Sequence, residues 1–341
     1  DDVVIPPGTG DDDIRARQST VDITAGDGDD TVTVSGLEDG DFVDGGAGTD
    51  LIKFYMNDAA YYNPADATTD TNEDFGDRFV DFEIVKLCRL NNETVDMAYL
   101  NDIQHVKIGY DADRGTLLGL SDGATLDFEY NNPGDTLTVE LTDTGDDESF
   151  NLNLFSAPHK IWNGVDGYEQ TEGGGDDFGT LTLNGVETLN LDTATRCQDF
   201  DMLDGDPTDG IDPSFIMSEI ALDMDALETL NITGTTDLDL TGNPLTTVET
   251  VDGSSYDNDL WLDLSGNAND VTVTLGAGNH EIMGGDGNDT ITVGGGSEIT
   301  GGEGLDTINL GSGVTEDDVD TLFYNAVTES QGTTVDVITG F

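Results

Sequence analysis

The chain has very few basic residues for its length. Its 341 residues include 10 Lys and Arg against 73 Asp and Glu, which gives a formal net charge of −63. A protein that binds nucleic acid needs a basic surface to replace the counterions of the phosphates, and binding to an anionic membrane needs a similar surface. We therefore expect neither a nucleic-acid partner nor an anionic membrane partner.

Long apolar runs are also missing. No stretch reaches the roughly 20 apolar residues of a membrane-spanning helix, so no membrane insertion is expected. The chain starts with DDVVIPP, which lacks the basic region and apolar run of a secretory signal. We expect that such a signal was removed or that export uses another route.

Histidine and cysteine are scarce, which limits the enzymatic chemistry. The three His residues stand far apart, and 280–284 (HEIMG) lacks the second His of a zinc-protease motif. No G-x-S-x-G nucleophile motif is present, so we expect no enzyme. Cys88 and Cys197 are separated by about a third of the chain. A disulfide within one chain would need a long loop to fold back, and a bridge between chains or two free thiols stay open.

A folded core is expected despite the charge. Apolar residues make up 35% of the chain, with 13 Phe, 9 Tyr and 2 Trp. The remaining difficulty is self-repulsion, which destabilises a compact state unless cations are bound. Two properties would reduce this repulsion: folding around divalent metal ions, and an acidic surface suited to high salt. The two are compatible.

Four nine-residue segments share one pattern, with Asp at the sixth place and an apolar residue at the eighth. They are AGDGDDTVT (25–33), GGAGTDLIK (45–53), GGDGNDTIT (284–292) and GGEGLDTIN (301–309). The pattern resembles the G-G-x-G-x-D-x-U-x nonapeptide of the RTX calcium-binding β-roll family. Two weaker copies depart from it: 275–283 has His280 at the sixth place, and 293–300 is one residue short and lacks Asp.

The resemblance implies Ca²⁺ as the cofactor. In that family the sixth-place Asp binds the ion between neighbouring coils, so Asp30 and Asp50 would lie along one edge, as would Asp289 and Asp306. The accompanying turn glycines in the metal sites are Gly26, Gly28, Gly46, Gly48, Gly285, Gly287, Gly302 and Gly304. The segment 204–210 resembles the start of an EF-hand loop, but its third Asp comes one place late.

A second pattern, apolar-x-x-apolar-x-apolar, fills the middle of the chain. It occurs at 82–87, 103–108, 186–191 and 227–232, with a partial copy at 248–251. The distances between successive starting positions are close to one, four, two and one multiples of a common interval. That interval is about 21 residues, and one coil of this length explains all the copies if the longer gaps contain four and two coils. Alternating strands such as 237–241 and 261–264 lie between the copies, which fits two strands per coil.

One apolar position continues from this pattern into the nonapeptides without a break. Its members are Leu230, Leu240, Val251, Leu262, Val273, Ile282, Ile291, Ile299 and Ile308. The half-coils are too short and too β-branched for the helices of a leucine-rich repeat. We therefore predict an all-β fold: a parallel β-solenoid of the β-roll kind, with about two short strands per coil of roughly 17–21 residues and with loop excursions.

The continuity of that position favours one solenoid domain over 1–341. We expect RTX-type coils at 20–56, longer coils at 79–265 and RTX-type coils again at 266–311. Breaks in the period predict loop excursions at 57–78, 164–179 and 194–218, with one or two helical turns at 214–220.

Two lysines, Lys86 and Lys107, recur at the same coil position, with Arg89 nearby. A polysaccharide lyase would need clustered basic residues to stabilise a carbanion. We favour the simpler interpretation, in which these residues offset the acidic surface.

The resemblance also implies a location and a function. Chains of this type are similar to bacterial surface-layer and extracellular matrix proteins exported by type I secretion, which uses an uncleaved C-terminal signal. The end, VDVITGF, resembles the opening of the segment that follows RTX repeats, so we expect a truncated, processed or partial chain. We predict a secreted, extracellular, calcium-dependent structural protein of the cell surface. It would self-assemble head to tail through the solenoid ends into a surface layer or filament.

Two alternatives stay open. One is an adhesin that binds glycans or cells, with cell-surface polysaccharide as a partner, and the other is a carbohydrate-active enzyme on the solenoid. The aromatic residues Tyr55, Tyr61, Tyr62 and Trp162 would serve either by stacking on sugar rings. They would serve a self-assembling protein equally well as interface anchors.

Overall fold

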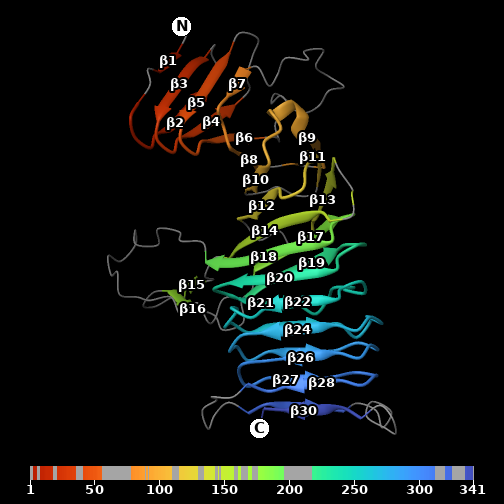
Figure 1. Cartoon of the computed structure of the whole chain (residues 1–341). Coiled ribbons are helices and arrows are strands. Elements are labelled where there is room, and N and C mark those ends of the chain that lie inside the picture. The colour runs from red at the N-terminus through yellow and green to blue at the C-terminus, as the bar shows by residue number, and fades with distance from the viewer. Residues whose placement is uncertain are drawn as a thin grey trace. The chain divides into compact units, whose positions relative to one another are not determined.

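The structure is a computed structural model, and the chain divides into two compact units, Asp1–Thr144 and Gly145–Phe341. It describes residues 3–5, 8–17, 21–35, 41–55, 78–88, 90, 92–109, 115–129, 134–142, 145, 147–156, 160–162, 168–170, 176–195, 217–311, 319–324 and 335–340. Both units are built from short parallel strands, so the prediction of an all-β parallel solenoid is confirmed (Figure 1).

In unit 1, successive strands alternate between facing sheets. One sheet has the order β1 (Val3–Ile5), β3 (Val21–Asp27), β5 (Phe42–Ala47) and β7 (Phe79–Val80). The second has the order β2 (Asp13–Arg17), β4 (Thr31–Ser35), β6 (Leu51–Tyr55), β8 (Ile84–Cys88), β10 (His105–Ile108) and β12 (Thr125–Phe128). The third contains β9 (Thr94–Asp96), β11 (Gly115–Leu120) and β13 (Thr136–Leu141). The short 3₁₀ helix η2 (Met97–Leu100) follows β9 and is capped by Asp96, whose carboxylate accepts the Ala98 N–H.

Unit 2 repeats this alternation with two parallel sheets. One has the order β14 (Ser149–Ser156), β18 (Thr188–Thr195), β20 (Thr229–Gly234), β22 (Thr250–Gly253), β24 (Thr272–Leu275), β26 (Thr290–Thr292), β28 (Thr307–Asn309) and β30 (Val337–Thr339). The other has the order β17 (Asp176–Leu183), β19 (Met217–Asp223), β21 (Asp237–Leu240), β23 (Leu260–Asp263), β25 (Glu281–Met283), β27 (Glu298–Thr300) and β29 (Thr321–Phe323). A separate antiparallel pair joins β15 (Lys160–Trp162) and β16 (Tyr168–Gln170).

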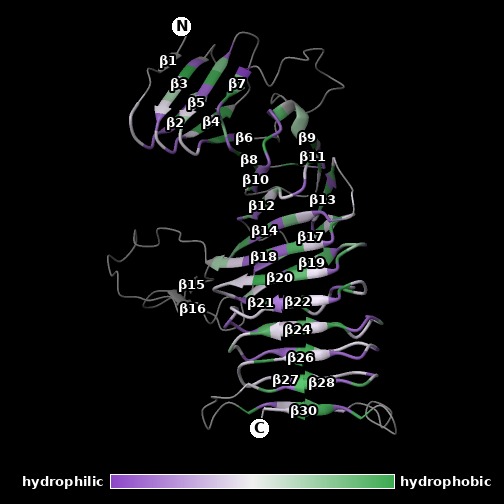
Figure 2. Cartoon of the chain, viewed as in Figure 1, coloured by the Kyte–Doolittle hydropathy of each residue, from purple (hydrophilic) through white to green (hydrophobic). Residues whose placement is uncertain are grey.

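The core of unit 2 contains the apolar column predicted from the sequence. Of every two successive residues along a strand, one side chain points inward, so apolar and polar residues alternate along the strands (Figure 2). All nine predicted positions from Leu230 to Ile308 are buried, and they alternate between the two sheets of unit 2. Register joins Leu230 to Val251 and Ile291 to Ile308. The coil of two strands is therefore confirmed over this part of the chain.

The predicted coil length is only partly right. Leu189 pairs directly with Leu230, so the interval between them forms one coil rather than the two that we expected. The extra residues lie between β18 and β19, in 196–216, outside the described residues. In the same way, Leu51 pairs directly with Ile84, across the predicted excursion at 57–78. Excursions lengthen a coil without adding a strand pair.

Two local predictions were wrong. The segment 164–179, expected as an excursion, contains the start of β17, because Asp176 and Phe178 are buried as strand residues. The helical turns expected at 214–220 are replaced by β19, which starts at Met217 and pairs with both β17 and β21. Pairing on both sides outweighs the weak local preference for helix. One continuous solenoid over 1–341, with its three zones, stays a prediction.

Candidate functional site

The sixth-place carboxylates of unit 1 form a hydrogen-bonded column from coil to coil. The Asp12 N–H donates to Asp30 Oδ1 at 2.8 Å, and the Asp30 N–H donates to Asp50 Oδ1 at 2.7 Å. The Asp50 N–H in turn donates to Glu83 Oε2 at 2.7 Å. We call Asp12, Asp30, Asp50 and Glu83 the unit 1 carboxylate column. Each accepting carboxylate satisfies a backbone donor at the turn of the preceding coil, where no strand bond is available.

Unit 2 has a column of the same kind. The Val271 N–H donates to Asp289 Oδ1 at 2.8 Å, and the Asp289 N–H donates to Asp306 Oδ1 at 2.9 Å. The Asp306 N–H donates to Asp336 Oδ1 at 3.1 Å. Further up the same sheet, the Glu148 N–H donates to Glu187 Oε2 at 2.9 Å. The unit 2 carboxylate column consists of Glu148, Glu187, Asp289, Asp306 and Asp336.

The structure thus brings the predicted pairs together. Asp30 and Asp50 lie on adjacent coils, and so do Asp289 and Asp306, as the sequence spacing predicted. All four side chains are almost completely buried. Their role as metal ligands stays a prediction.

The second carboxylate oxygen distinguishes some members of the columns. Asp289 Oδ2 accepts the Gly285 N–H at 3.0 Å. Asp30 Oδ2, Asp50 Oδ2 and Glu148 Oε2 are buried and have no hydrogen-bond partner among the described residues. A buried anionic oxygen without a partner is costly, because it has lost its water and gained nothing in exchange. These atoms therefore call for a cation or a proton.

The position-one glycines leave room for the carboxylates. An ideal Cβ on Gly45 would lie 2.1 Å from the Asp81 carbonyl oxygen and 3.0 Å from Asp50 Oδ2. An ideal Cβ on Gly284 would likewise lie 2.1 Å from the Gly301 carbonyl oxygen and 2.9 Å from Asp289 Oδ2. A side chain at either place would collide with backbone that cannot move alone, so glycine is required there.

The predicted turn glycines lie directly against the preceding coil. Gly46 has φ +99°, and its ideal Cβ would lie 2.1 Å from the Gly26 carbonyl oxygen. The same close approach to a carbonyl or backbone atom of the preceding coil holds at the other predicted positions, namely Gly26, Gly28, Gly48, Gly285, Gly287, Gly302 and Gly304. Backbone carbonyls therefore line the turns next to the carboxylates.

The carboxylate and carbonyl oxygens at these turns fit the coordination of Ca²⁺. The ion takes oxygen ligands and accepts backbone carbonyls beside carboxylates, and both kinds of donor are present at the turns of Asp30 and Asp50. No group of three or more His, Cys, Asp or Glu side chains that could hold a metal occurs in the described part of the chain. A bound cation would therefore need backbone oxygens in addition to one or two carboxylates. The Gly-rich turns provide such oxygens.

The carboxylates carry an electrostatic cost in the absence of a cation. Burial raises the pKa of Asp50; the Asp30 N–H works against this shift, and the charges of Asp30 and Glu83 add to it. Burial likewise raises the pKa of Asp289, against the N–H groups of Val271 and Gly285. In both cases the ionised form is disfavoured.

The opposite edge of unit 2 lacks this charge over two coils. His280 occupies the sixth place there and is 1% exposed, and neither ring nitrogen has a hydrogen-bond partner among the described residues. Burial lowers the pKa of His280, which keeps the imidazole neutral. The His280 N–H donates to Ser297 Oγ at 3.3 Å, and the Ser297 N–H donates to Asp320 Oδ1 at 3.0 Å. Between the coils of His280 and Ser297 a neutral hydroxyl therefore takes the place of the carboxylate acceptor, and a carboxylate returns at Asp320.

Sequence reasoning missed the glutamate members of the columns. Glu83, Glu148 and Glu187 occupy the place of the nonapeptide Asp, two residues before the buried apolar residue of the strand. The signal was present in the segments EIVK (83–86) and ETLN (187–190), which align with DTIT (289–292) and have Glu in place of Asp. Because the nonapeptide pattern has Asp at the sixth place, coils with Glu there do not match it, and one column is divided between two motifs.

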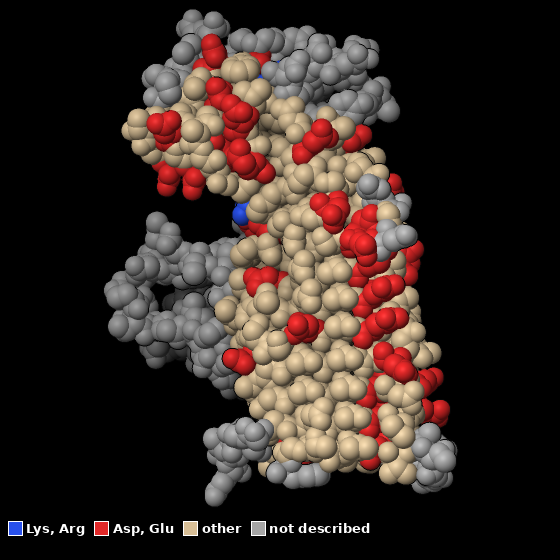
Figure 3. Space-filling model, in the orientation of Figure 1, with Lys and Arg blue, Asp and Glu red and all other residues tan. Residues whose placement is uncertain are grey.

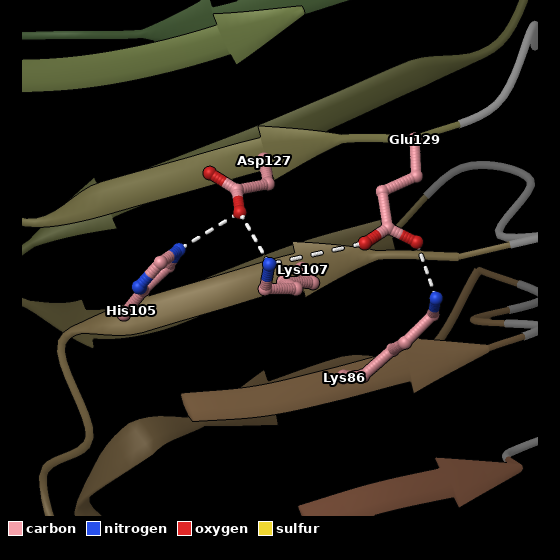
Figure 4. A network of polar contacts seen from close by, with 5 residues as sticks. All are labelled: Lys86, His105, Lys107, Asp127 and Glu129. Carbon is pink, nitrogen blue, oxygen red and sulfur yellow. Dashed lines mark hydrogen bonds and ion pairs between the residues drawn. The ribbon is translucent and has the colours of Figure 1, made fainter. Parts of the chain in front are cut away.

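A second polar cluster lies on the outer face of unit 1 (Figure 4). Lys86 pairs with Lys107 in register, as predicted, and Lys86 Nζ forms an ion pair with Glu129. Lys107 Nζ lies 3.0 Å from Asp127 Oδ2, and His105 Nε2 lies 2.9 Å from the same oxygen. These pairs support the interpretation that the lysines offset acidic charge.

Several other predicted features lie outside the described residues. These are Cys197, Arg89, Tyr61, Tyr62 and the acidic segment 204–210, while nothing is described of the side chains of Tyr55 and Trp162. Cys88 is buried on β8. The alternatives for the two cysteines stay as predicted.

No family model matches the chain, and no curated protein matches it. Among the described residues, no helix has the length and apolar character that crossing a membrane requires. The function is therefore inferred from the contacts of the two carboxylate columns and from the surfaces of the two units.

Proposed function

We propose that the chain is a calcium-dependent, self-assembling, extracellular structural protein, a subunit of a surface layer or filament, with no catalytic activity. The observation that carries the calcium requirement is the pair of buried oxygens, Asp30 Oδ2 and Asp50 Oδ2, which lack a hydrogen-bond partner among the described residues and lie next to glycine turns. When bound, Ca²⁺ would neutralise these carboxylates and hold neighbouring coils together.

The residues of the chain already do part of this work. Oδ1 of each Asp accepts an N–H from the preceding coil, which fixes the side chain, and Asp50 Oδ2 lies beside Gly45. Gly45, at the first place of the Asp50 nonapeptide, keeps the space beside that oxygen clear. Because little of the turn must rearrange, binding would mainly add stability to the folded coils.

Self-assembly is supported by the far end of unit 2. Six of the seven exposed large apolar residues that the structure describes lie there: Leu305, Val319, Phe323, Tyr324, Val335 and Val337. Strands β29 and β30 end their sheets, so each is paired on one side only among the described strands. A strand edge with exposed apolar side chains favours pairing with another chain.

The test of the calcium requirement is thermal unfolding followed by far-ultraviolet circular dichroism in Ca²⁺, in Mg²⁺ and in chelator. We expect a higher melting temperature in Ca²⁺ than in chelator, with Mg²⁺ less effective because it demands a stricter geometry. Identical melting curves in Ca²⁺ and chelator would contradict the proposal.

Assembly is tested by sedimentation and electron microscopy after Ca²⁺ is added. Ordered polymers are expected from the full chain. Deleting residues 1–7, which removes β1, or introducing Val337→Lys on β30 should abolish the polymers from opposite ends and leave Ca²⁺-dependent melting intact. If both variants assemble normally, the joint between copies does not use the solenoid ends.

A further inference from the structure

The few cations of this chain are concentrated on one sheet. Five of the ten Lys and Arg residues lie on four strands of a single sheet of unit 1: Arg15 and Arg17 on β2, Lys53 on β6, Lys86 on β8 and Lys107 on β10. In contrast, Figure 3 shows few Lys and Arg among the described residues of the face that it draws.

Three of these residues form a row with one lysine on each strand. Register pairs Lys53 with Lys86 and Lys86 with Lys107 on adjacent strands. Their neighbours in sequence, such as Val85 and Val106, point into the core, so the lysines lie on the outer face. We call Lys53, Lys86 and Lys107 the lysine ladder. The side chains of Lys86 and Lys107 are 17% and 21% exposed and still reach solvent while they pair with Glu129 and Asp127.

Unit 2 carries a row of the opposite sign. Register pairs Asp177 with Glu219 and Glu219 with Asp239, and then joins Asp239 to Trp261, Trp261 to Glu281 and Glu281 to Glu298. We call Asp177, Glu219, Asp239, Glu281 and Glu298 the acidic ladder. Glu219, Glu281 and Glu298 are exposed. Their neighbours along each strand point into the core, as Leu238 does beside Asp239.

The acidic ladder is unfavourable by itself. Like charges directly opposite each other on neighbouring strands destabilise a sheet. Burial raises the pKa of Glu219, and the charges of Asp177 and Asp239 raise it further. A row of cations placed on this face would relieve that repulsion. Trp261, in the middle of the row, would offer its ring face to a lysine or arginine as well.

We propose that the lysine ladder of one copy binds the acidic ladder of a second copy. Both rows are set by the spacing of parallel strands, about 4.8 Å, so three lysines on consecutive strands match three carboxylates on consecutive strands without distortion. Two copies with a net charge of −63 each repel one another over most of their surfaces, and the contact of opposite charges directs them to this face. The inference rests on the self-assembly proposed above and adds a lateral contact to it.

The first test is the effect of charge reversal on self-association. Lys53→Glu reverses one end of the lysine ladder without touching the ion pairs of Lys86 and Lys107. In sedimentation velocity with Ca²⁺ held constant, Lys53→Glu should weaken self-association about tenfold, which corresponds to one close charge pair across an interface. Glu219→Lys should do the same. Raising the NaCl concentration should weaken the association of the unaltered chain.

The control is Lys160→Glu, which makes the same charge change on β15, a strand outside the sheets that carry the two ladders, and should leave association unchanged. The second test locates the contact directly. Zero-length cross-linking of a mixture of heavy-isotope and ordinary chains should give mixed cross-links between lysine-ladder and acidic-ladder residues.

Each result has a distinct meaning. Equal association of Lys53→Glu and Lys160→Glu overturns the ladder contact, and so do cross-links found only within one chain. Polygalacturonate is a probe for an anionic glycan. If the unaltered chain binds it, Lys53→Glu abolishes that binding and the association of copies is unaffected, the lysine ladder binds a glycan instead, and the contact between copies is overturned. A chain that does not associate at all in Ca²⁺ would refute the proposed function itself. Unchanged Ca²⁺-dependent melting in Lys53→Glu shows that any loss of association is not a loss of folding.

Discussion

Replacing Asp50 with Asn separates the two roles of this carboxylate, which are to accept a hydrogen bond and to carry a negative charge for a cation. The change keeps Oδ1, which accepts the Asp30 N–H at 2.7 Å, and removes the negative charge carried by the buried Oδ2. Without a cation, the ionised Asp50 is disfavoured, since burial and the charges of Asp30 and Glu83 raise its pKa. We therefore expect Asp50→Asn to be at least as stable as the unaltered chain in chelator.

In Ca²⁺ the order should reverse. A ligand present at a hundred times its dissociation constant stabilises the folded state by about 2.7 kcal/mol. For a unit of about 150 residues, about 1 kcal/mol changes the melting temperature by roughly 2–4 °C. If Asn removes one such site, Asp50→Asn should melt about 5–10 °C below the unaltered chain in saturating Ca²⁺. Calorimetry of both chains in millimolar Ca²⁺ and in chelator measures the difference.

Two matched variants complete this test. Asp27→Asn makes the same charge change at the exposed third place of the nonapeptide 25–33. Its melting temperature relative to the unaltered chain should not change sign between chelator and Ca²⁺. Asp50→Ala also removes the acceptor of the Asp30 N–H, so it should lose about 1–3 kcal/mol in chelator and should lose the contribution of the cation in addition in Ca²⁺. If Asp50→Asn shifts the melting temperature by the same amount and sign in Ca²⁺ and in chelator, the carboxylate has no cation-dependent role and the reasoning fails.

Three further predictions concern unit 2. Burial raises the pKa of Asp237 to about 6 from its ordinary value of 3.8, so the folded state holds this proton more tightly than the unfolded chain. Stability should therefore fall as pH rises through that interval, and urea unfolding should show a smaller fall for Asp237→Asn. Gly284→Ala places a Cβ 2.1 Å from the Gly301 carbonyl oxygen and should cost about 1–3 kcal/mol in thermal unfolding, whereas Gly242→Ala, with no atom within 4 Å, should cost much less. Tyr256→Phe removes a buried hydroxyl that donates to the Thr236 carbonyl; because Thr193 Oγ1 also donates to that carbonyl, at 2.9 Å, the loss measured by denaturant unfolding should stay at about 1 kcal/mol.

The inward positions of the strands could be predicted from the sequence because strand alternation has a fixed period. Leu230, Leu240 and Val251 recur at nearly equal intervals, and each interval corresponds to one strand and one turn. The same logic placed Asp289 next to Asp306 and Lys86 next to Lys107. These predictions needed only the repeat and the pleat of a strand.

Coil counts could not be predicted where excursions interrupt the repeat. Spacing in sequence counts residues, and an excursion as long as a coil is indistinguishable from a coil. The interval from Leu189 to Leu230 therefore suggested two coils, whereas pairing on both sides of β18 shows one. Strand β19 was missed for a related reason, because its burial depends on neighbours that lie far away in sequence.

The carboxylate columns explain why the sixth place is acidic on one edge and variable on the other. A turn needs only one acceptor for the N–H of the preceding coil, and Ser297 Oγ supplies it to His280 without charge. In unit 1 the carboxylates of Asp30 and Asp50 do the same, and each leaves a second oxygen that has no hydrogen-bond partner among the described residues. Hydrogen bonding alone would permit Ser in place of Asp30 or Asp50, since a neutral acceptor avoids the repulsion that a column of carboxylates creates. The charge of the second oxygen is therefore the feature that hydrogen bonding does not require, and a bound cation is the partner that would make it favourable. On this argument the response to Ca²⁺ belongs to the carboxylate edge, while the edge of His280 and Ser297 should hold its coils together equally well with or without the ion.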